Sequence, residues 1–200
     1  MKRRALLAGA GAAAATPFFN SWAGLTSRET ANEKMVLSNF NSGYVRPGVA
    51  WQGFSDRVMG GVSTAKLDTA FIDGKQCVRL SGNVTRENNG GFIQLALIFG
   101  RNYAELNASG YKGVEALVYG NNERYNIHVR TPDCDWYDQS YRMTFFAEPQ
   151  WQRIRVPWEA FEGNRVSEPL DNSRLVRLAV LGWMREFDAD IALAEISLYS

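Results

Sequence analysis

Short apolar runs separated by turn residues constrain the fold of this chain more than any other feature. Within the runs apolar and polar residues alternate, which is typical of strands with one buried face. Turn signals recur about every 8 to 12 residues, and no segment keeps a helical period for more than a turn or two. The sequence therefore predicts an all-β chain, an antiparallel β-sandwich of the jelly-roll kind. The predicted strands cover residues 35–40, 63–68, 76–80, 92–99, 114–119, 125–130, 141–146, 152–156, 175–181 and 191–198.

The clearest local pattern in the sequence is a predicted β-hairpin. Residues 114–119 and 125–130 both alternate, and the segment Gly120-Asn121-Asn122-Glu123 between them supplies turn residues. In the second of these strands the aliphatic and aromatic residues share one face, which leaves His128 on the opposite face. We therefore expect the single histidine of the chain to lie at the surface or at a sheet edge.

The last strand contains an irregularity in its alternation. Ile191 and Leu193 have one parity, whereas Ile196 and Leu198 have the other. A β-bulge near residues 194–195 would place all four side chains on the core side. The sequence thus predicts a bulged strand at the end of the chain.

The length of the chain predicts one domain, and its charge gives no indication of a polyanionic partner. A chain of 200 residues forms one core and buries about 70% of its unfolded surface. The formal net charge is +1, from 22 basic and 21 acidic residues. Nothing in this balance favours nucleic acid or an anionic surface as the partner.

The first residues have the composition of an export signal. Lys2-Arg3-Arg4 precedes an Ala-rich and Gly-rich apolar run, and Ser21-Trp22-Ala23 resembles a cleavage site. The arginine pair followed by leucines also resembles a twin-arginine signal. We expect residues 1–23 to be a leader, 24–34 a linker and 35–200 the domain of a periplasmic or exported protein. A mitochondrial presequence is the alternative, since no acidic residue precedes Glu29.

The least generic segment, residues 51–63, predicts a shaped turn leading into a sheet. Gly60 and Gly61 allow a positive φ or the close approach of another group. Asp56 can accept hydrogen bonds from nearby backbone N–H groups, and Arg57 offers a fork of donors. Met59 can fill a gap or meet an adaptable partner. We expect valine at either glycine to disrupt the turn more than Asp56→Ala does, through backbone strain of ~1–3 kcal/mol.

The segment Asp56-Arg57-Val58-Met59-Gly60-Gly61-Val62-Ser63 resembles the Asp-x-Val-Met-Gly-Gly-x-Ser signature of the complex I intermediate-associated protein 30 family. Further resemblance lies in residues 89–92, 120–125, 151–161 and the last strand, so that it spans residues 36–200. The resemblance implies a galactose-binding-like sandwich that binds a protein partner and helps to assemble a membrane respiratory complex. It does not imply an enzyme. Complex I carries its peripheral arm on the cytoplasmic or matrix side, so an exported member would reach only membrane-arm surfaces or serve another client.

On this hypothesis the signature turn is the contact surface for the protein partner. Its candidate residues are Asp56, Arg57, Met59, Gly60, Gly61 and Ser63.

The sequence contains few of the residue patterns that enzymes use for catalysis. The usual nucleophilic triads would depend wholly on His128, and no sequence pattern positions a nucleophile near it. Neither a phosphate-binding glycine loop nor a His-Glu-x-x-His motif occurs. We therefore expect no enzymatic activity and no cofactor.

An acidic and aromatic segment, residues 133–138, supports an alternative function. Its three carboxylates could ligate Ca²⁺, but their spacing departs from an EF-hand, and we expect a solvated acidic loop without a metal ion. Trp136, Tyr137 and Tyr141 could form a platform on which a sugar ring stacks, as in a carbohydrate-binding module. Core packing explains these three rings equally well.

The two cysteines, Cys77 and Cys134, have no nearby Cys or His partner in the sequence, so a metal site is not indicated. They could form a disulfide in an exported protein or be two separate buried thiols.

Overall fold

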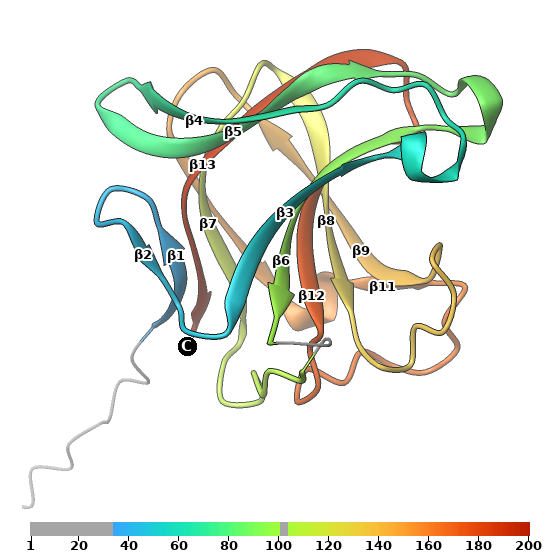
Figure 1. The fold of residues 1–200 in the computed structure, drawn as a ribbon. Helices are drawn as coiled ribbons and strands as arrows, with labels where there is room; N and C mark the ends of the chain where they lie inside the picture. Colours follow the sequence, from blue (N-terminus) through green and yellow to red (C-terminus); the bar gives the residue numbers. More distant parts are fainter. Residues whose placement is uncertain (1–33, 101–103) are drawn as a thin grey trace, which may run out of the picture. The chain divides into compact units, whose positions relative to one another are not determined.

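The strands of the computed structural model form two antiparallel sheets packed face to face (Figure 1). The structure describes residues 34–100 and 104–200, and the predicted antiparallel sandwich is confirmed. The strands are β1 Met35–Asn39, β2 Tyr44–Val45, β3 Val49–Ser55, β4 Lys66–Ile72, β5 Lys75–Val84, β6 Phe92–Phe99, β7 Gly113–Tyr119, β8 Glu123–Arg130, β9 Ser140–Ala147, β10 Gln152–Pro157, β11 Glu162–Asn164, β12 Arg177–Trp183 and β13 Phe187–Tyr199. Three short 3-10 helices are η1 Asp56–Met59, η2 Glu87–Asn89 and η3 Trp158–Ala160.

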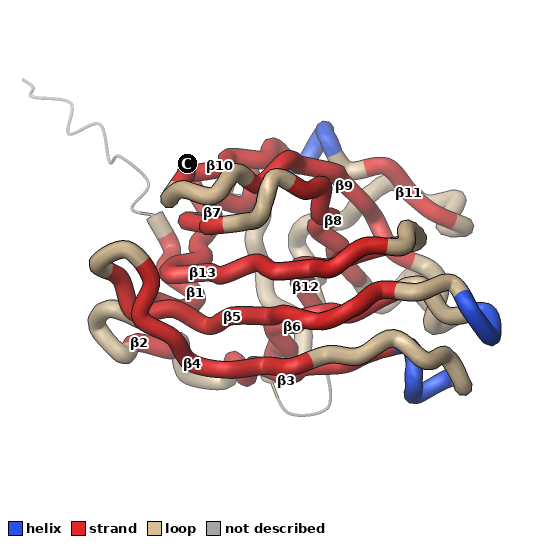
Figure 2. The backbone as a smooth tube through the Cα atoms, turned by 90° about the horizontal axis from the view of Figure 1, so that it is seen from above, coloured by secondary structure: helices blue, strands red, loops and turns tan. Residues whose placement is uncertain are grey.

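Strand β13 organises the larger sheet, which we call sheet A. One edge of β13 pairs with β7, and β7 pairs with β10. The other edge pairs first with β5 and then with β1, which carry β4 and β2 respectively. The second sheet, sheet B, has the strand order β11-β9-β8-β12-β6-β3. Figure 2 shows η1 and η2 next to each other, where the chain leaves β3 and where it enters β6.

The predicted hairpin of residues 114–119 and 125–130 does not form. Strand β7 belongs to sheet A, and β8 belongs to sheet B, where it pairs with β9 and β12. The turn between them carries the chain from one sheet to the other. Alternation identified the buried face of β8 correctly, but it does not determine which strand is the hydrogen-bonding neighbour.

The predicted bulge in the last strand is confirmed. The register of β13 against β7 shifts between Leu193 and Glu195. Ile191 and Leu193 before the shift, and Ile196 and Leu198 after it, are all at most 1% exposed. The bulge therefore keeps both halves of a 13-residue strand facing the core.

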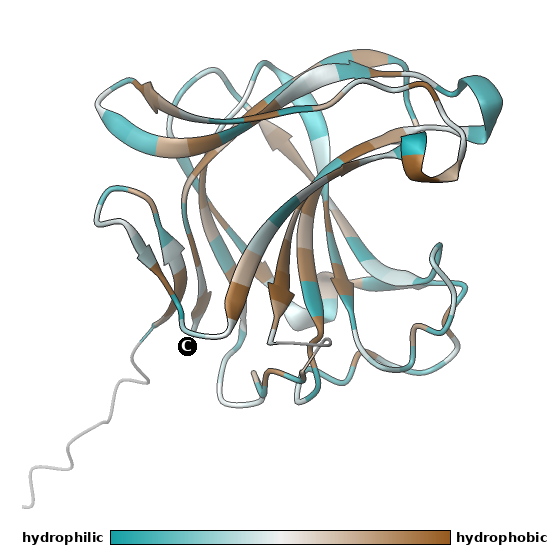
Figure 3. Ribbon diagram, viewed as in Figure 1, coloured by the Kyte–Doolittle hydropathy of each residue, from teal (hydrophilic) through white to brown (hydrophobic). Residues whose placement is uncertain are grey.

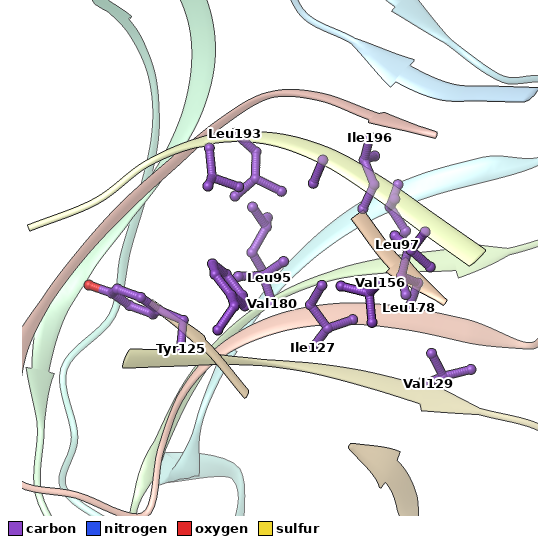
Figure 4. Close-up of a cluster of buried hydrophobic side chains, with 14 of the residues drawn as sticks. Leu95, Leu97, Tyr125, Ile127, Val129, Val156, Leu178, Val180, Leu193 and Ile196 are labelled. Carbon is purple, nitrogen blue, oxygen red and sulfur yellow. The ribbon is translucent and has the colours of Figure 1, made fainter. Parts of the chain in front are cut away.

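The core lies between the two sheets and is built from alternate residues of the facing strands. Figure 4 shows Leu193 and Ile196 of sheet A directed toward Leu95, Ile127 and Val180 of sheet B. In Figure 3 hydrophobic and hydrophilic positions alternate along the strands, as expected of layers with one buried face.

The structure bears on the cysteines but not on the predicted leader. Cys77 and Cys134 are buried free thiols, so the structure contains the unpaired alternative. The predicted leader 1–23 and all of the linker 24–34 except its last residue lie outside the described residues. In the part of the chain that is described, no helix is both long and apolar enough to span a membrane.

Candidate functional site

The carboxylate of Asp56 fastens the signature turn to a second loop. It accepts hydrogen bonds from the N–H and hydroxyl of Ser63, the first at 2.9 Å, and from the N–H groups of Gly91 at 2.6 Å and Phe92 at 3.2 Å. Burial raises the pKa of Asp56, but these hydrogen bonds favour the ionised form and bring its pKa below the usual value. Instead of the local turn expected from the sequence, Asp56 joins segments 35 residues apart.

Two glycine pairs make room for this carboxylate. A Cβ at Gly61 would lie 2.8 Å from the Cβ of Asp56, and one at Gly90 would collide with its carboxylate. Gly60 and Gly91 have φ values of +91° and +135°, which L side chains rarely adopt. Both expected uses of glycine, positive φ and close approach, therefore occur around Asp56.

The six predicted contact residues fall into two groups. One group is buried and supports the turn, so its members do not present a surface to a partner in this structure. The other group is exposed, and within it Met59 lines a cleft. The buried residues are Asp56, Gly61 and Ser63, and the exposed residues are Arg57, Met59 and Gly60.

The face of sheet B that points away from the core is apolar along its middle. Ala96 and Ile98 of β6 and Ala179 and Leu181 of β12 are all at most 6% exposed and form a second hydrophobic cluster. Trp183 packs against this cluster from outside. Neighbouring side chains cover most of this cluster, and Leu181, Phe54 and Trp183 are the members that also line the cleft.

A cleft of about 550 Å³ lies on this outer face. Its floor is formed by residues of β6, β8, β9 and β12, and its walls come from η1, the η2 turn and the 131–139 loop that follows β8. Figure 1 shows these turns on the same side of sheet B. The volume is within the range of about 300–1,000 Å³ that is common for ligand sites. Through Asp56, the signature turn and the η2 turn are held together as one wall of this cleft.

The cleft is lined by four arginines and, among the described residues, by one carboxylate. Arg165 forms an ion pair with that carboxylate, Asp138. Arg130 of β8 and Arg177 of β12 are direct cross-strand partners. Like charges in such positions destabilise a sheet unless something compensates for them. The fourth arginine is Arg142 of β9, and the lining as a whole is basic.

Two of the arginines also hold the 131–139 loop in place. Arg130 donates hydrogen bonds to the carbonyl oxygens of Cys134 at 2.6 Å, Trp136 at 2.9 Å and Tyr137 at 3.0 Å. Arg142 donates to the carbonyl oxygen of Asp138 at 2.7 Å. These bonds fix the loop as the second wall of the cleft.

His128 is buried in the cleft floor, which corrects the expectation of a surface histidine. It does lie on the outward face of β8, but it is only 6% exposed and its ring meets Trp183 edge to face at 4.9 Å. Burial, followed by the charges of Arg142, Arg177 and Arg130, lowers the pKa of His128 well below its usual value. The imidazole is therefore neutral at pH 7.

The structure also places a hydroxyl beside this histidine, which the sequence did not indicate. Ser140 Oγ is 3.5 Å from His128 Nδ1 and accepts a hydrogen bond from Arg142 Nε at 2.8 Å. Ser140 is 3% exposed, and His128 Nε2 has no hydrogen-bond partner among the described residues. The pair thus lacks the carboxylate that orients the base in a catalytic triad.

The predicted three-ring platform does not form. Trp136 and Tyr137 are 68% and 71% exposed, and Tyr137 lines the cleft. Tyr141 is 1% exposed and donates its hydroxyl hydrogen bond to the carbonyl oxygen of Glu168 at 3.0 Å. The alternation of β9 turns Tyr141 into the core, whereas Arg142, its neighbour, faces the cleft.

The acidic segment is partly engaged in ion pairs. Asp133 pairs with Arg174 at 2.8 Å and accepts a hydrogen bond from Thr131, while Asp138 pairs with Arg165. Within residues 34–100 and 104–200, no three His, Cys, Asp or Glu side chains are grouped so as to hold a metal ion.

A family model described as "Complex I intermediate-associated protein 30 (CIA30)" matches residues 39–182. This chain belongs to the CIA30 family. The match covers most of the chain, including the signature turn and the strands β3, β6, β8, β9 and β11 that contribute to the cleft. None of the curated proteins compared with the chain matches it.

The solved structures similar to this CIA30-family protein include carbohydrate-binding modules. The family 11 module of the cellulosomal cellulase Lic26A-Cel5E of Clostridium thermocellum superimposes with a TM-score of 0.63 at 11% identity, over 84% of this chain and 95% of the module. A family 30 carbohydrate-binding module gives a TM-score of 0.56 at 16% identity, over 84% of this chain and 89% of that one. At these identities the likeness shows a shared fold.

Proposed function

We propose that this CIA30-family protein is a non-catalytic module that holds a protein partner in the cleft on sheet B. Through this contact it acts in the assembly or stabilisation of a membrane respiratory complex. Family membership supports the assembly role. The proposal places the partner on the cleft floor, between the Asp56-fastened wall and the 131–139 loop.

The observation that carries the proposal is the surface chemistry of the cleft. Met59 and Met184 line it and are 43% and 45% exposed. Flexible thioether side chains adapt to the irregular apolar side chains of another protein. The ring of Trp183 is less suited to a sugar, because the guanidinium of Arg142 lies 4.5 Å above it and Phe92 and His128 pack against it.

Carbohydrate binding is a second candidate function because one exposed ring does line the cleft. Tyr137 is 71% exposed there, and the amide side chains of Gln139 and Asn164 line the same cleft. A sugar would stack on Tyr137 and bond to these amides.

We further propose that residues 1–23 direct export, and that the domain acts outside the cytoplasm. An exported protein would meet only the membrane-arm surfaces of a respiratory complex. A reporter fused after residue 34 that is active only in the cytoplasm tests this directly, because activity of the fusion would contradict export.

The assembly role can be tested by deletion and complementation. We expect deletion to lower the amount of the assembled respiratory complex on native gels, and the wild-type chain to restore it. Met59→Glu should fail to restore it, because a charge in the apolar part of the cleft opposes docking. Phe71→Glu is the matched control, since Phe71 is 66% exposed on β4 and lies outside the cleft. Equal rescue by both variants would contradict the role of the cleft.

A titration of tryptophan fluorescence with β-1,3-1,4-linked and other oligosaccharides distinguishes carbohydrate binding from protein binding. The proposal predicts no saturable change. A saturable change that Tyr137→Ala abolishes would establish the alternative function.

A further inference from the structure

We propose that the partner segment in the cleft carries an acidic side chain next to apolar ones, and that its carboxylate is bound at the basic part of the floor. This inference rests on the proposed function and names the chemistry of the partner. Arg142, Arg177 and His128 form this part of the floor, which we call the basic floor.

The sheet register gathers these groups on three adjacent strands. His128 of β8 is the cross-strand partner of Arg142 on β9. Arg177 of β12 is the partner of Arg130, two residues further along β8. Cross-strand side chains on one face lie about 5 Å apart and interact. A carboxylate above this part of β8 would be within reach of groups from both neighbouring strands.

The charge of Arg142 on the cleft floor is not balanced by an ion pair in the described part of the chain. Arg142 bonds to a carbonyl oxygen and a hydroxyl, and within the described residues no carboxylate lies at ion-pair distance from it; Asp138, which attracts it from further away, is ion-paired with Arg165. Burial disfavours the charged form of Arg142 and lowers its pKa. A guanidinium held in such a place is stabilised by an anion from outside, in the bidentate geometry that arginine and carboxylate share.

One ring nitrogen of His128, Nε2, is buried without a hydrogen-bond partner among the described residues. Arg142 Nε donates to Ser140 Oγ, so the hydroxyl proton is available to His128 Nδ1. The neutral ring then carries its own proton on Nε2, which is buried and has no acceptor in the described part of the chain. A buried donor without an acceptor is costly, and a carboxylate supplies the acceptor once Trp183 shifts to admit it.

Apolar surroundings favour an acidic protein segment over phosphate or an acidic sugar. Phe54, Phe92 and Leu181 line the cleft together with the exposed methionines. Inorganic phosphate has no apolar groups to cover these side chains, and the C–H face of a uronic acid stacks on a single ring and leaves the other apolar side chains uncovered. A Glu or Asp flanked by Leu, Met or Phe satisfies both parts of the cleft.

Selection from a random 12-residue peptide display library against the full chain tests the proposal while the natural partner is still unidentified. We expect the enriched peptides to contain an acidic residue beside apolar ones. The dissociation constant of the most enriched peptide is then compared with that of the same peptide carrying Gln for Glu. We expect the change to weaken binding about tenfold or more, as for the loss of a charged hydrogen bond.

Variants locate the site of this effect. Arg142→Gln and Arg177→Gln should weaken the Glu peptide about tenfold or more and the Gln peptide much less. Arg142→Lys keeps the positive charge but loses the paired N–H donors of the guanidinium. Its affinity for the Glu peptide should lie between those of the wild type and Arg142→Gln. Arg46→Gln removes the same charge between β2 and β3, outside the cleft, and should leave binding unchanged. Thermal unfolding of each variant identifies any that fail to fold. Because Arg142 and Arg177 lie on different strands, one variant still tests the proposal if the other does not fold.

The outcomes separate this inference from the proposed function. Enriched peptides without acidic residues that still lose binding with Met59→Glu would overturn the inference and leave the protein-binding cleft intact. Peptides unaffected by every cleft variant, or no enrichment at all, would overturn both. Oligogalacturonate binding that needs Arg142 and displaces the peptides with equal or higher affinity would overturn the protein partner in favour of an acidic sugar.

Discussion

At the scale of single residues, Asp56 determines the shape of the site wall. Its ionised carboxylate replaces four contacts that backbone N–H groups and a hydroxyl would otherwise make with water. Because the carboxylate is fully buried, its removal leaves those donors without acceptors. The signature turn and the η2 turn would then separate.

We therefore predict that Asp56→Asn lowers the free energy of unfolding by about 2–4 kcal/mol. The amide keeps the shape of the side chain but presents a second donor where an acceptor is needed. Urea unfolding followed by fluorescence measures the change, and Asp135→Asn in an exposed loop is the matched control. Equal stability of the two variants would show that the Asp56 hydrogen bonds contribute little.

This prediction revises the sequence-based expectation that the glycines matter more than Asp56. A Cβ at Gly60 meets no atom within 4 Å, so valine there costs backbone strain alone, about 1–3 kcal/mol. Gly61 differs, because its substitution would displace Asp56 itself. The expected order of damage is therefore Gly61 and Asp56 first, then Gly60.

A second residue, Glu115, makes the stability of the fold depend on pH. Glu115 of β7 is 2% exposed and pairs with Lys34 at 2.7 Å and with Arg153 and Arg155 at 2.5 Å each. Burial raises the pKa of Glu115, but the ion pairs with Lys34, Arg155 and Arg153 outweigh this and hold the pKa at about 2, below the usual 4.5. The ionised form is thus favoured by folding.

We predict that the contribution of Glu115 is fully present above pH 4.5 and is lost as the pH falls through about 2. The sign follows because the folded state binds the proton more weakly than the unfolded state does. Urea midpoints of the wild type and Glu115→Gln, measured from about pH 7 down to about pH 2, should converge as the pH falls. A constant difference across this range would contradict the assignment.

At the scale of strands, the sequence pattern predicted which side chains of a strand are buried better than it predicted which strands pair. The expected bounds of residues 92–99 agree with β6, and the parity change in β13 located its bulge. The buried face of residues 125–130 was also assigned correctly. The pairing of this segment with residues 114–119 was wrong because a turn between two alternating strands fits a hairpin and a crossover between sheets equally well.

The β13 bulge gives a prediction at the same scale. Deleting Ala194 removes the extra residue, so Ile196 and Leu198 would turn away from the core. Losing two buried aliphatic side chains costs about 2–5 kcal/mol each, and we expect no cooperative unfolding transition. Deleting Ser167, an exposed loop residue before β12, should change the midpoint little. A native-like transition without Ala194 would mean that β13 tolerates either register.

The site was harder to predict than the fold. The signature turn and Tyr137 were identified as candidates, and both contribute to the cleft walls. The basic floor was missed because Arg142, Arg177 and His128 lie on three strands whose adjacency follows from sheet order. The sequence does contain a signal, because several predicted strands carry an arginine on the outward face. Only the order of the strands in the sheet shows that these arginines are neighbours.

At the scale of the whole described domain, the two faces of sheet B have separate roles. The inner face completes the hydrophobic core, and the outer face carries a second apolar cluster, a basic floor and two walls made by turns. Rigid strands support the floor, and hydrogen bonds from Asp56, Arg130 and Arg142 fix the walls. We expect this outer face to be occupied by a protein partner.

Site-specific photocrosslinking in living cells tests that claim most directly. A benzophenone amino acid replaces Met59 in the cleft or, as the control, Phe71 on β4 of sheet A. We predict that irradiation of the Met59 variant gives one discrete protein adduct, and that the Phe71 variant gives none. An adduct from position 71 alone, or no protein adduct from position 59, would contradict the protein-binding cleft.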